Sequence, residues 1–129
     1  MMGCRLNILK FMDQCMVNKR YVQGYRFEKY VVAPFFRKVG YYVMESRGSH
    51  GLYDLICVPN TDVSKYKYPL KPLMIQAKDS KYVAPSVFEH IKKEHKWEGI
   101  PLIVNNLADP HKKAKLLIRN VDGVEFDFI

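Results

Sequence analysis

The chain has few cysteines, a single tryptophan and no long apolar run. Its three cysteines, Cys4, Cys15 and Cys57, are odd in number and lack metal-type spacing, which favours reduced intracellular thiols over a disulfide framework. No apolar run approaches the ~20 residues that span a bilayer. The first residues also lack the basic start and apolar segment of a secretory signal. We therefore expect a soluble, cytoplasmic protein that is neither secreted nor bound to a membrane.

Acidic residues are in the minority. The 129 residues include 21 Lys and Arg against 13 Asp and Glu, a formal net charge of +8, and the hydrophobic content of 48% is enough for a compact core. This length predicts a single domain over residues 1–129, in which residues 1–18 form an N-terminal arm or short amphipathic helix. The basic balance favours a polyanionic partner such as a phosphate backbone.

Cations and aromatic rings alternate in the segment Lys65-Tyr66-Lys67-Tyr68. The segment is too polar for a core, and its composition suits contacts with a nucleic-acid backbone together with base stacking. Lys19-Arg20 and Lys112-Lys113 are further candidate contacts. An ordinary solvated surface explains each of these clusters equally well.

Three polar residues stand at the ends of two apolar runs. Asp54 opens one run, and Gln76 and Lys78 close the next. Side chains two apart on a strand share a face, so Gln76 and Lys78 should point the same way, and a neighbouring strand would bring Asp54 to them. Magnesium takes hard oxygen ligands and keeps several waters. The pattern predicts a magnesium site made by Asp54, the side-chain oxygen of Gln76 and the Ala77 carbonyl.

The chemistry that such a site favours is phosphodiester cleavage. The metal would polarise the phosphate and lower the pKa of a bound water, while Lys78 would orient that water or offset developing charge. Taken singly, Asp54 could cap a turn and Lys78 could be a solvated strand end. The ordered set favours the metal site.

A glycine-rich turn, residues 46–51, precedes Asp54. Its two glycines allow close backbone approach, and its hydroxyls, amides and Arg47 can bind phosphate, so Ser46, Arg47 and Ser49 are expected to position DNA. His50 could take part in proton transfer, although a turn histidine is more often a bystander.

The remaining pattern predicts a mixed sheet with helices on its faces. Helical spacing covers residues 24–38, where Pro34 should kink or shorten the helix and Gly40 should end it. Ser86 is predicted to cap a helix running to Glu98. The spacing of His90 and His95 does not favour zinc. Strands are predicted over residues 41–45, 52–58, 72–78 and 101–104, followed by segments 114–119 and 124–128 around a hairpin turn at 120–123.

The stretch from Gly24 to Lys78 resembles the archaeal-type Holliday junction resolvases and their virus and phage relatives. This branch belongs to a nuclease superfamily whose signature is Asp, then Glu or Asp, any residue, and Lys. Weaker similarity continues over residues 86–96 and 99–104. The matching pieces are Gly24-Tyr25-Arg26-Phe27-Glu28, Ser46-Arg47-Gly48-Ser49-His50-Gly51-Leu52-Tyr53-Asp54-Leu55-Ile56 and Ile75-Gln76-Ala77-Lys78.

The resemblance implies an α/β fold with a restriction-endonuclease-like core, a mixed central sheet flanked by helices. It implies Glu28, Asp54, Gln76 and Lys78 as catalytic residues, and Glu28, Asp54, Gln76 and Ala77 as ligands of Mg²⁺, for which Mn²⁺ would substitute. No other small-molecule cofactor is expected. The residues expected to bind DNA are Arg26, Ser46, Arg47, Ser49, His50, Lys65, Lys67 and Lys81.

The function implied is a homodimer that resolves four-way DNA junctions by paired symmetric nicks, in recombination and repair. If the chain is viral, it would act in the host cytoplasm. Gln76 stands where the family usually has Glu, and a neutral amide offers an oxygen without the charge. Three alternatives stay open: a nicking or flap-type nuclease, a catalytically idle junction-binding protein, and an RNA-bound interaction module.

Overall fold

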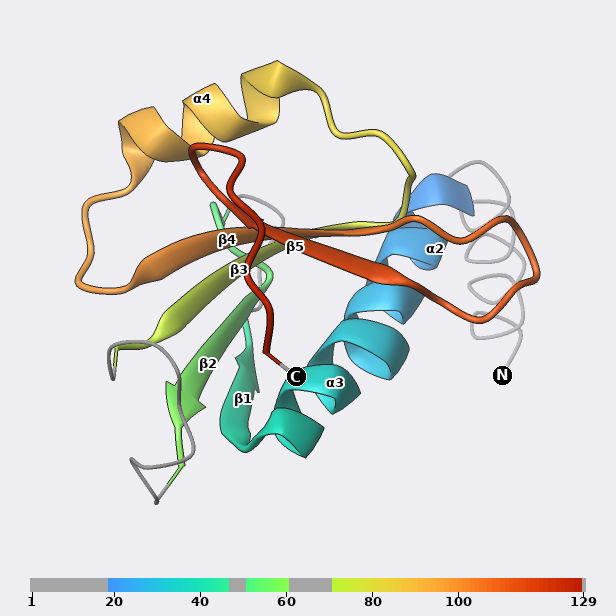
Figure 1. Ribbon diagram of the computed structural model, residues 1–129, viewed down its shortest axis with the longest axis horizontal. Helices are drawn as coiled ribbons and strands as arrows, with labels where there is room; N and C mark the ends of the chain where they lie inside the picture. Colours follow the sequence, from blue (N-terminus) through green and yellow to red (C-terminus); the bar gives the residue numbers. More distant parts are fainter. Residues whose placement is uncertain (1–18, 47–50, 61–70, 129) are drawn as a thin grey trace, which may run out of the picture.

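The computed structural model describes residues 19–46, 51–60 and 71–128. In this part of the chain a five-stranded mixed sheet has the strand order β1-β2-β3-β4-β5 (Figure 1). β3 and β4 pair in parallel, and the other neighbours pair in antiparallel fashion. The α/β class is therefore as predicted. The strands are β1 (Tyr41–Glu45), β2 (Leu55–Pro59), β3 (Leu73–Lys78), β4 (Ile100–Asn106) and β5 (Leu116–Asn120).

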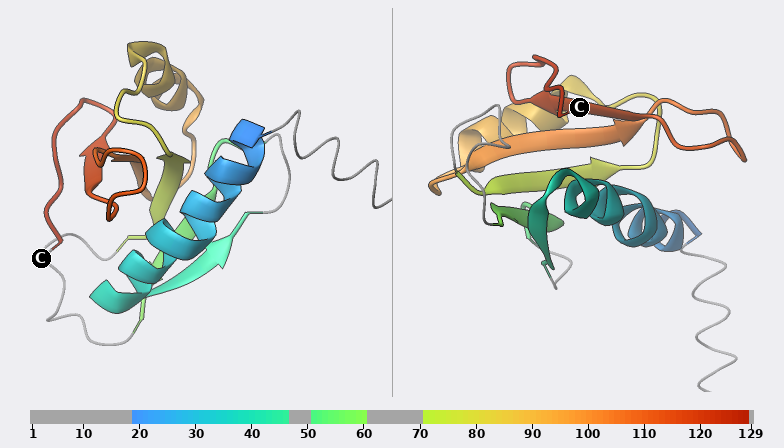
Figure 2. Two further views of the ribbon diagram at one scale, coloured as in Figure 1. Left: turned by 90° about the vertical axis from the view of Figure 1, so that its right-hand side faces the viewer. Right: turned by 60° about the horizontal axis from the view of Figure 1, so that its bottom comes forward.

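One face of the sheet is covered by a helical unit of three consecutive segments. These are α2 (Lys19–Phe27), the π-helical segment η1 (Glu28–Val32) and α3 (Ala33–Val39), and the views in Figure 2 place this unit opposite α4 across the sheet. The π turn lies just before Pro34, as expected where a proline can donate no backbone N–H and its ring crowds the preceding turn. Gly40, with φ of 116°, ends the unit as predicted and donates its N–H to the Arg37 carbonyl.

The main core lies between this helical unit and the sheet. Phe27, Val32 and Phe36 are buried against strand residues that include Leu55 and Ile75. Burying each of these side chains contributes about 1.5–3 kcal/mol. The helix that carries Glu28 is therefore held firmly against β2 and β3.

The opposite face of the sheet is covered by α4 (Pro85–Glu94), whose Ile91 is buried with Met74 and Ile103. The helix begins one residue before the predicted Ser86, and its N-cap, Ala84, makes no side-chain capping bond. The predicted cap at Ser86 is therefore wrong, because Pro85 already presets the first helical φ. None of the helices within residues 19–46 and 71–128 is long and apolar enough to cross a membrane.

The predicted extension of α4 to Glu98 is also wrong. His95 leaves the helical conformation, with ψ of 119°. Its ring Nδ1 is hydrogen-bonded to the Tyr53 hydroxyl, and its Nε2 lies 3.3 Å from the Gly99 carbonyl oxygen. These two contacts, one tertiary and one local, compete with another helical turn as the chain turns toward β4.

Two strands have limits that differ from the predicted ones. β2 begins at Leu55 instead of Leu52, since residues 52–54 are bent into the approach to the sheet. β4 extends beyond the predicted 101–104 at both ends because both of its edges are paired, with β3 and with β5.

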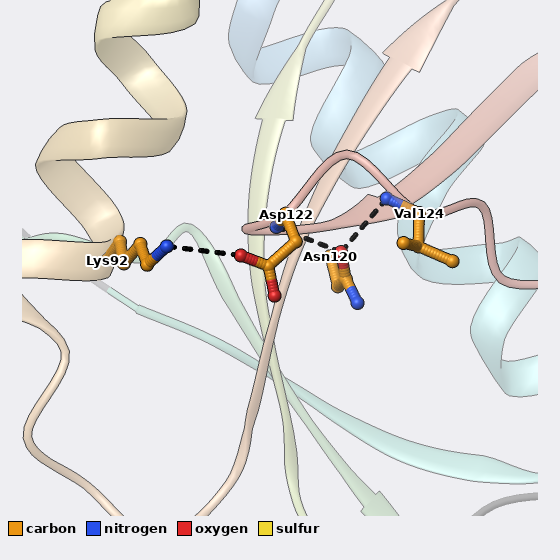
Figure 3. Close-up of polar contacts among 4 residues, drawn as sticks. All are labelled: Lys92, Asn120, Asp122 and Val124. Carbon is orange, nitrogen blue, oxygen red and sulfur yellow. Dashed lines mark hydrogen bonds and ion pairs between the residues drawn. The ribbon is translucent and has the colours of Figure 1, made fainter.

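The predicted hairpin is only partly formed. The turn is present: Gly123 has a φ of 82°, and the Asn120 side-chain oxygen accepts hydrogen bonds from the N–H groups of Asp122 and Val124. An ion pair of 3.2 Å joins Asp122 to Lys92 on α4 (Figure 3). Residues 124–128 form one isolated bridge instead of the predicted strand, since the aromatic rings at 126 and 128 pack on the core.

Candidate active site

Asp54 lies where β2 and β3 begin to diverge, one residue before the start of β2. Its N–H donates to the Ile75 carbonyl at 2.7 Å, and its carbonyl accepts from the N–H of Ser46 at 2.9 Å. Its carboxylate Oδ2 accepts from the Ala77 N–H at 2.8 Å. Backbone and side chain are both held, so the second carboxylate oxygen has a defined direction.

The Glu28 carboxyl group interacts with Asp54 from the face of the sheet that the helical unit covers. Glu28 is the first residue of the π segment, a type of turn that is frequent at functional sites. Burial, the charge of Asp54 and a hydrogen bond with Asp54 raise the pKa of Glu28 to about 7. Two neighbouring carboxyl groups disfavour ionisation of each other, because two like charges repel at close range. The structure therefore brings together two of the predicted site residues, one from the helical unit and one from the residue before β2.

Lys78 acts electrostatically on both carboxyl groups. Burial raises the pKa of Asp54, while the Ala77 N–H, the Glu28 hydrogen bond and the Lys78 charge lower it. Lys78 also lowers the pKa of Glu28. Its side chain, at the exposed end of β3, is thus a cation beside the carboxylate pair.

Gln76 and Lys78 line the same open groove, of about 760 Å³, between the sheet and α4. Ala77, between them, is buried in the core on the helical-unit side. This alternation is the one expected for side chains on a strand. Gln76 is half-buried, so its amide is held at the wall of the groove and not in open solvent.

These donors fit a hard divalent cation. Two carboxylates, an amide oxygen and a backbone carbonyl are the oxygen ligands that Mg²⁺ takes. Burial and the neighbouring Asp54 charge raise the pKa of Glu28, and a cation bound to the two carboxyl groups would lower it. Within residues 19–46, 51–60 and 71–128, however, no group of three or more His, Cys, Asp or Glu side chains is arranged to hold a metal. A site here would depend on Gln76 and Ala77 as well as on the two acids.

Glu45 is a further carboxylate near the pair that the sequence pattern did not single out. Its charge raises the pKa of Glu28. It lies at the end of β1, where Tyr41 and Val43 are buried against the helical unit. Because residues two apart share a face, this alternation was the signal that could have placed Glu45 on the Glu28 side.

Asp79 connects the elements around the site but is not one of the proposed site residues. One carboxylate oxygen accepts from the Gln23 amide on α2 at 2.9 Å, and the other accepts from the Asn106 amide on β4 at 3.1 Å. These bonds tie the helical unit and the sheet together one residue beyond Lys78. Asp79 therefore helps to position the elements that carry Glu28 and Lys78.

Three of the residues predicted to bind DNA lie within the described part of the chain. Arg26 and Ser46 are exposed, on α2 and directly after β1. Lys81 is exposed but pairs with Asp109, so part of its charge is already offset. The predicted N-terminal arm and Arg47, Ser49, His50, Lys65 and Lys67 lie outside the described residues.

Comparison of the chain with protein-family models, with curated proteins and with solved structures found no match.

Proposed function

We propose that the protein is a magnesium-dependent DNA endonuclease that resolves four-way junctions. The observation that supports it best is the Glu28–Asp54 carboxyl pair, fixed by the Ala77 N–H and placed beside Lys78. The resemblance of residues 24–78 to junction resolvases also supports a junction nuclease. The net charge of +8 favours binding to the phosphate backbone of DNA. The corresponding proposal for the fold is a restriction-endonuclease-like core.

The residues of the chain divide the work in this proposal. Glu28, Asp54, the Gln76 oxygen and the Ala77 carbonyl would hold Mg²⁺. When bound, the ion supplies Lewis acidity and a water of lowered pKa. Asp54 is oriented in advance by the Ala77 N–H, so little reorganisation is needed on binding. The Lys78 ammonium offsets negative charge that develops on the phosphate.

Two equivalent cuts favour a homodimer. A four-way junction has approximate two-fold symmetry, and closed two-fold dimers are the commonest symmetric oligomers. Junction shape and phosphate positions would determine specificity, and binding would weaken steeply as salt increases.

The deciding experiment is cleavage of a labelled four-way junction in Mg²⁺, with linear duplex, flap and single-stranded DNA alongside. The proposal expects symmetric cuts near the crossover, reduced at least about 100-fold in Asp54→Asn with junction affinity retained. Glu98→Gln, which removes a carboxylate from a side chain that is 93% exposed, is the matched control and should cut normally. Preferred cutting of flaps would replace the resolvase by a flap-type nuclease.

A second candidate function is favoured by one residue. Gln76 removes a negative charge from the proposed ligand set, which lowers its attraction for a cation. A catalytically idle junction-binding protein would bind the junction tightly and leave it uncut in both Mg²⁺ and Mn²⁺.

A further inference from the structure

The groove beside the proposed catalytic residues is also lined by an exposed aromatic ring. Its lining includes Gln76, Lys78 and Trp97. The Trp97 side chain, which follows α4, is 56% exposed. A volume of about 760 Å³ falls in the range of roughly 300–1,000 Å³ that is usual for small-ligand sites. The chain thus leaves a large apolar ring accessible next to its candidate active site.

Two neighbouring rings hold Trp97 in place. Tyr53 and His95 contact it edge to face, with ring centroids 6.0 and 6.1 Å away. They are themselves joined, because the Tyr53 hydroxyl is hydrogen-bonded to His95 Nδ1. The Gly99 carbonyl oxygen can only accept, so His95 Nε2 donates to it, and in the neutral ring Nδ1 then accepts from the Tyr53 hydroxyl. Trp97 is therefore a supported platform and not a loose surface side chain.

The polar lining of the groove suits a base better than a phosphate. Glu94 lines it and would repel a phosphate, but its carboxylate can accept from an exocyclic amino group. Ser86 and His90 add further hydrogen-bonding groups along α4. Positive charge comes from Lys78, at the part of the groove next to the carboxyl pair. This distribution of charge suits a phosphate beside Lys78 and a base beside Trp97.

We propose that the groove receives one unstacked nucleobase of the strand to be cut, with its ring stacked on Trp97 and its phosphate beside Lys78. Stacking on an exposed aromatic ring tolerates any base, since every base has a π face. A carboxylate at Glu94 adds a preference for bases that carry an exocyclic amino group. This inference rests on the proposed nuclease function and names the part of the DNA that the site holds.

Trp97 is the only tryptophan of the chain, so its fluorescence reports on the groove directly. The probe is an oligodeoxycytidylate of about eight nucleotides, compared with an abasic oligomer of equal length and charge. We expect the cytidylate to quench Trp97 emission and to protect it from acrylamide, and the abasic oligomer to do neither. Binding detected by anisotropy without any change in Trp97 emission, or equal quenching by the abasic oligomer, would overturn the inference.

Substitutions supply the second test. Trp97→Ala should weaken oligocytidylate binding by roughly 5- to 100-fold, and Trp97→Phe should retain most of it, because a phenyl ring still stacks. Tyr82→Ala is the matched control, since Tyr82 is 72% exposed but lines a different cavity. Circular dichroism confirms that each variant folds. Unchanged binding by Trp97→Ala would contradict the nucleobase site.

The two proposals fail in different ways. If the wild-type protein cuts junctions and Trp97→Ala cuts them equally well, the nucleobase site is wrong and the nuclease function stands. If no DNA is cut but the cytidylate still quenches Trp97 and the abasic oligomer does not, the base-binding groove stands and the catalytic proposal fails.

Discussion

The Asp54 carboxylate accepts a hydrogen bond from the backbone N–H of Ala77, at 2.8 Å. Asp54 directly precedes β2, and Ala77 lies in β3 between Gln76 and Lys78. A side chain therefore continues the pairing of the two strands at the point where they separate. The consequence is that Asp54 has both a structural and a chemical role, and the two can be measured separately.

Asp54 variants should differ in stability in the absence of a metal ion. Asn still offers an oxygen to the Ala77 N–H and removes a charge that burial disfavours, so Asp54→Asn should be at least as stable as wild type at neutral pH. Ala leaves that N–H without its acceptor and should be about 1–3 kcal/mol less stable than the Asn variant. Urea unfolding in EDTA measures this order, and an Ala variant as stable as the Asn variant would contradict it.

Glu28 should make metal-free stability depend on pH. Its pKa is raised to about 7 in the fold from an ordinary value of 4.5. Protonated Glu28 therefore contributes fully to the free energy of unfolding below about pH 4.5, and this contribution is lost as pH rises through about 7. Glu28→Gln should flatten this part of the profile, whereas Glu98→Gln should follow wild type. Urea midpoints between these pH values measure it, and parallel wild-type and Glu28→Gln profiles would disprove the carboxyl pairing.

Gln76→Glu tests how much the missing charge matters. An added carboxylate at the groove wall should strengthen the attraction for Mg²⁺, and we expect half-maximal cutting at a roughly tenfold lower Mg²⁺ concentration, about 1.4 kcal/mol. Tyr82→Glu adds the same charge at an exposed site that lines a different cavity and should have no such effect. A Gln76→Glu protein with unchanged Mg²⁺ dependence would show that position 76 does not contact the ion.

Cys57 should be chemically silent in the folded protein. The side chain is fully buried, and burial raises the pKa of its thiol to about 12, so the reactive thiolate is scarce even at pH 9. In a Cys4→Ser, Cys15→Ser background, alkylation should proceed only as urea unfolds the chain. Labelling in native buffer at the rate of a free thiol would refute the burial of β2.

Two glycines should respond to alanine in opposite directions. Gly24 lies within α2, and an added Cβ meets nothing within 4 Å, so Gly24→Ala should stabilise the protein by about 0.5–1 kcal/mol. Gly99 has a φ of 152°, and a Cβ there would lie 3.0 Å from the Pro72 carbonyl oxygen. Gly99→Ala should therefore destabilise by about 1–3 kcal/mol. Thermal unfolding of the pair gives the comparison, and equal effects of one sign would be inconsistent with these backbone environments.

The local elements followed from the sequence because they depend on neighbours along the chain. Gly40 ends the helical unit because glycine adopts the left-handed backbone conformation at little cost in free energy. The apolar runs before Pro59 and Lys78 form β2 and β3. Strand alternation also placed Gln76 and Lys78 on one face, with Ala77 on the other. Periodicity and backbone conformation were enough for these features.

Only the tertiary structure decided where distant residues meet. The end of α4 depends on the Tyr53–His95 hydrogen bond, which joins residues 42 apart, and no local pattern encodes it. The proximity of Glu28 to Asp54 and Glu45 depends on how the helical unit packs on the sheet, and so does the raised pKa of Glu28. Burial and the Coulomb interaction depend on distance in space and not on separation along the chain. The amino-acid sequence therefore determined which ionisable groups are present, and the packing determined which of them interact.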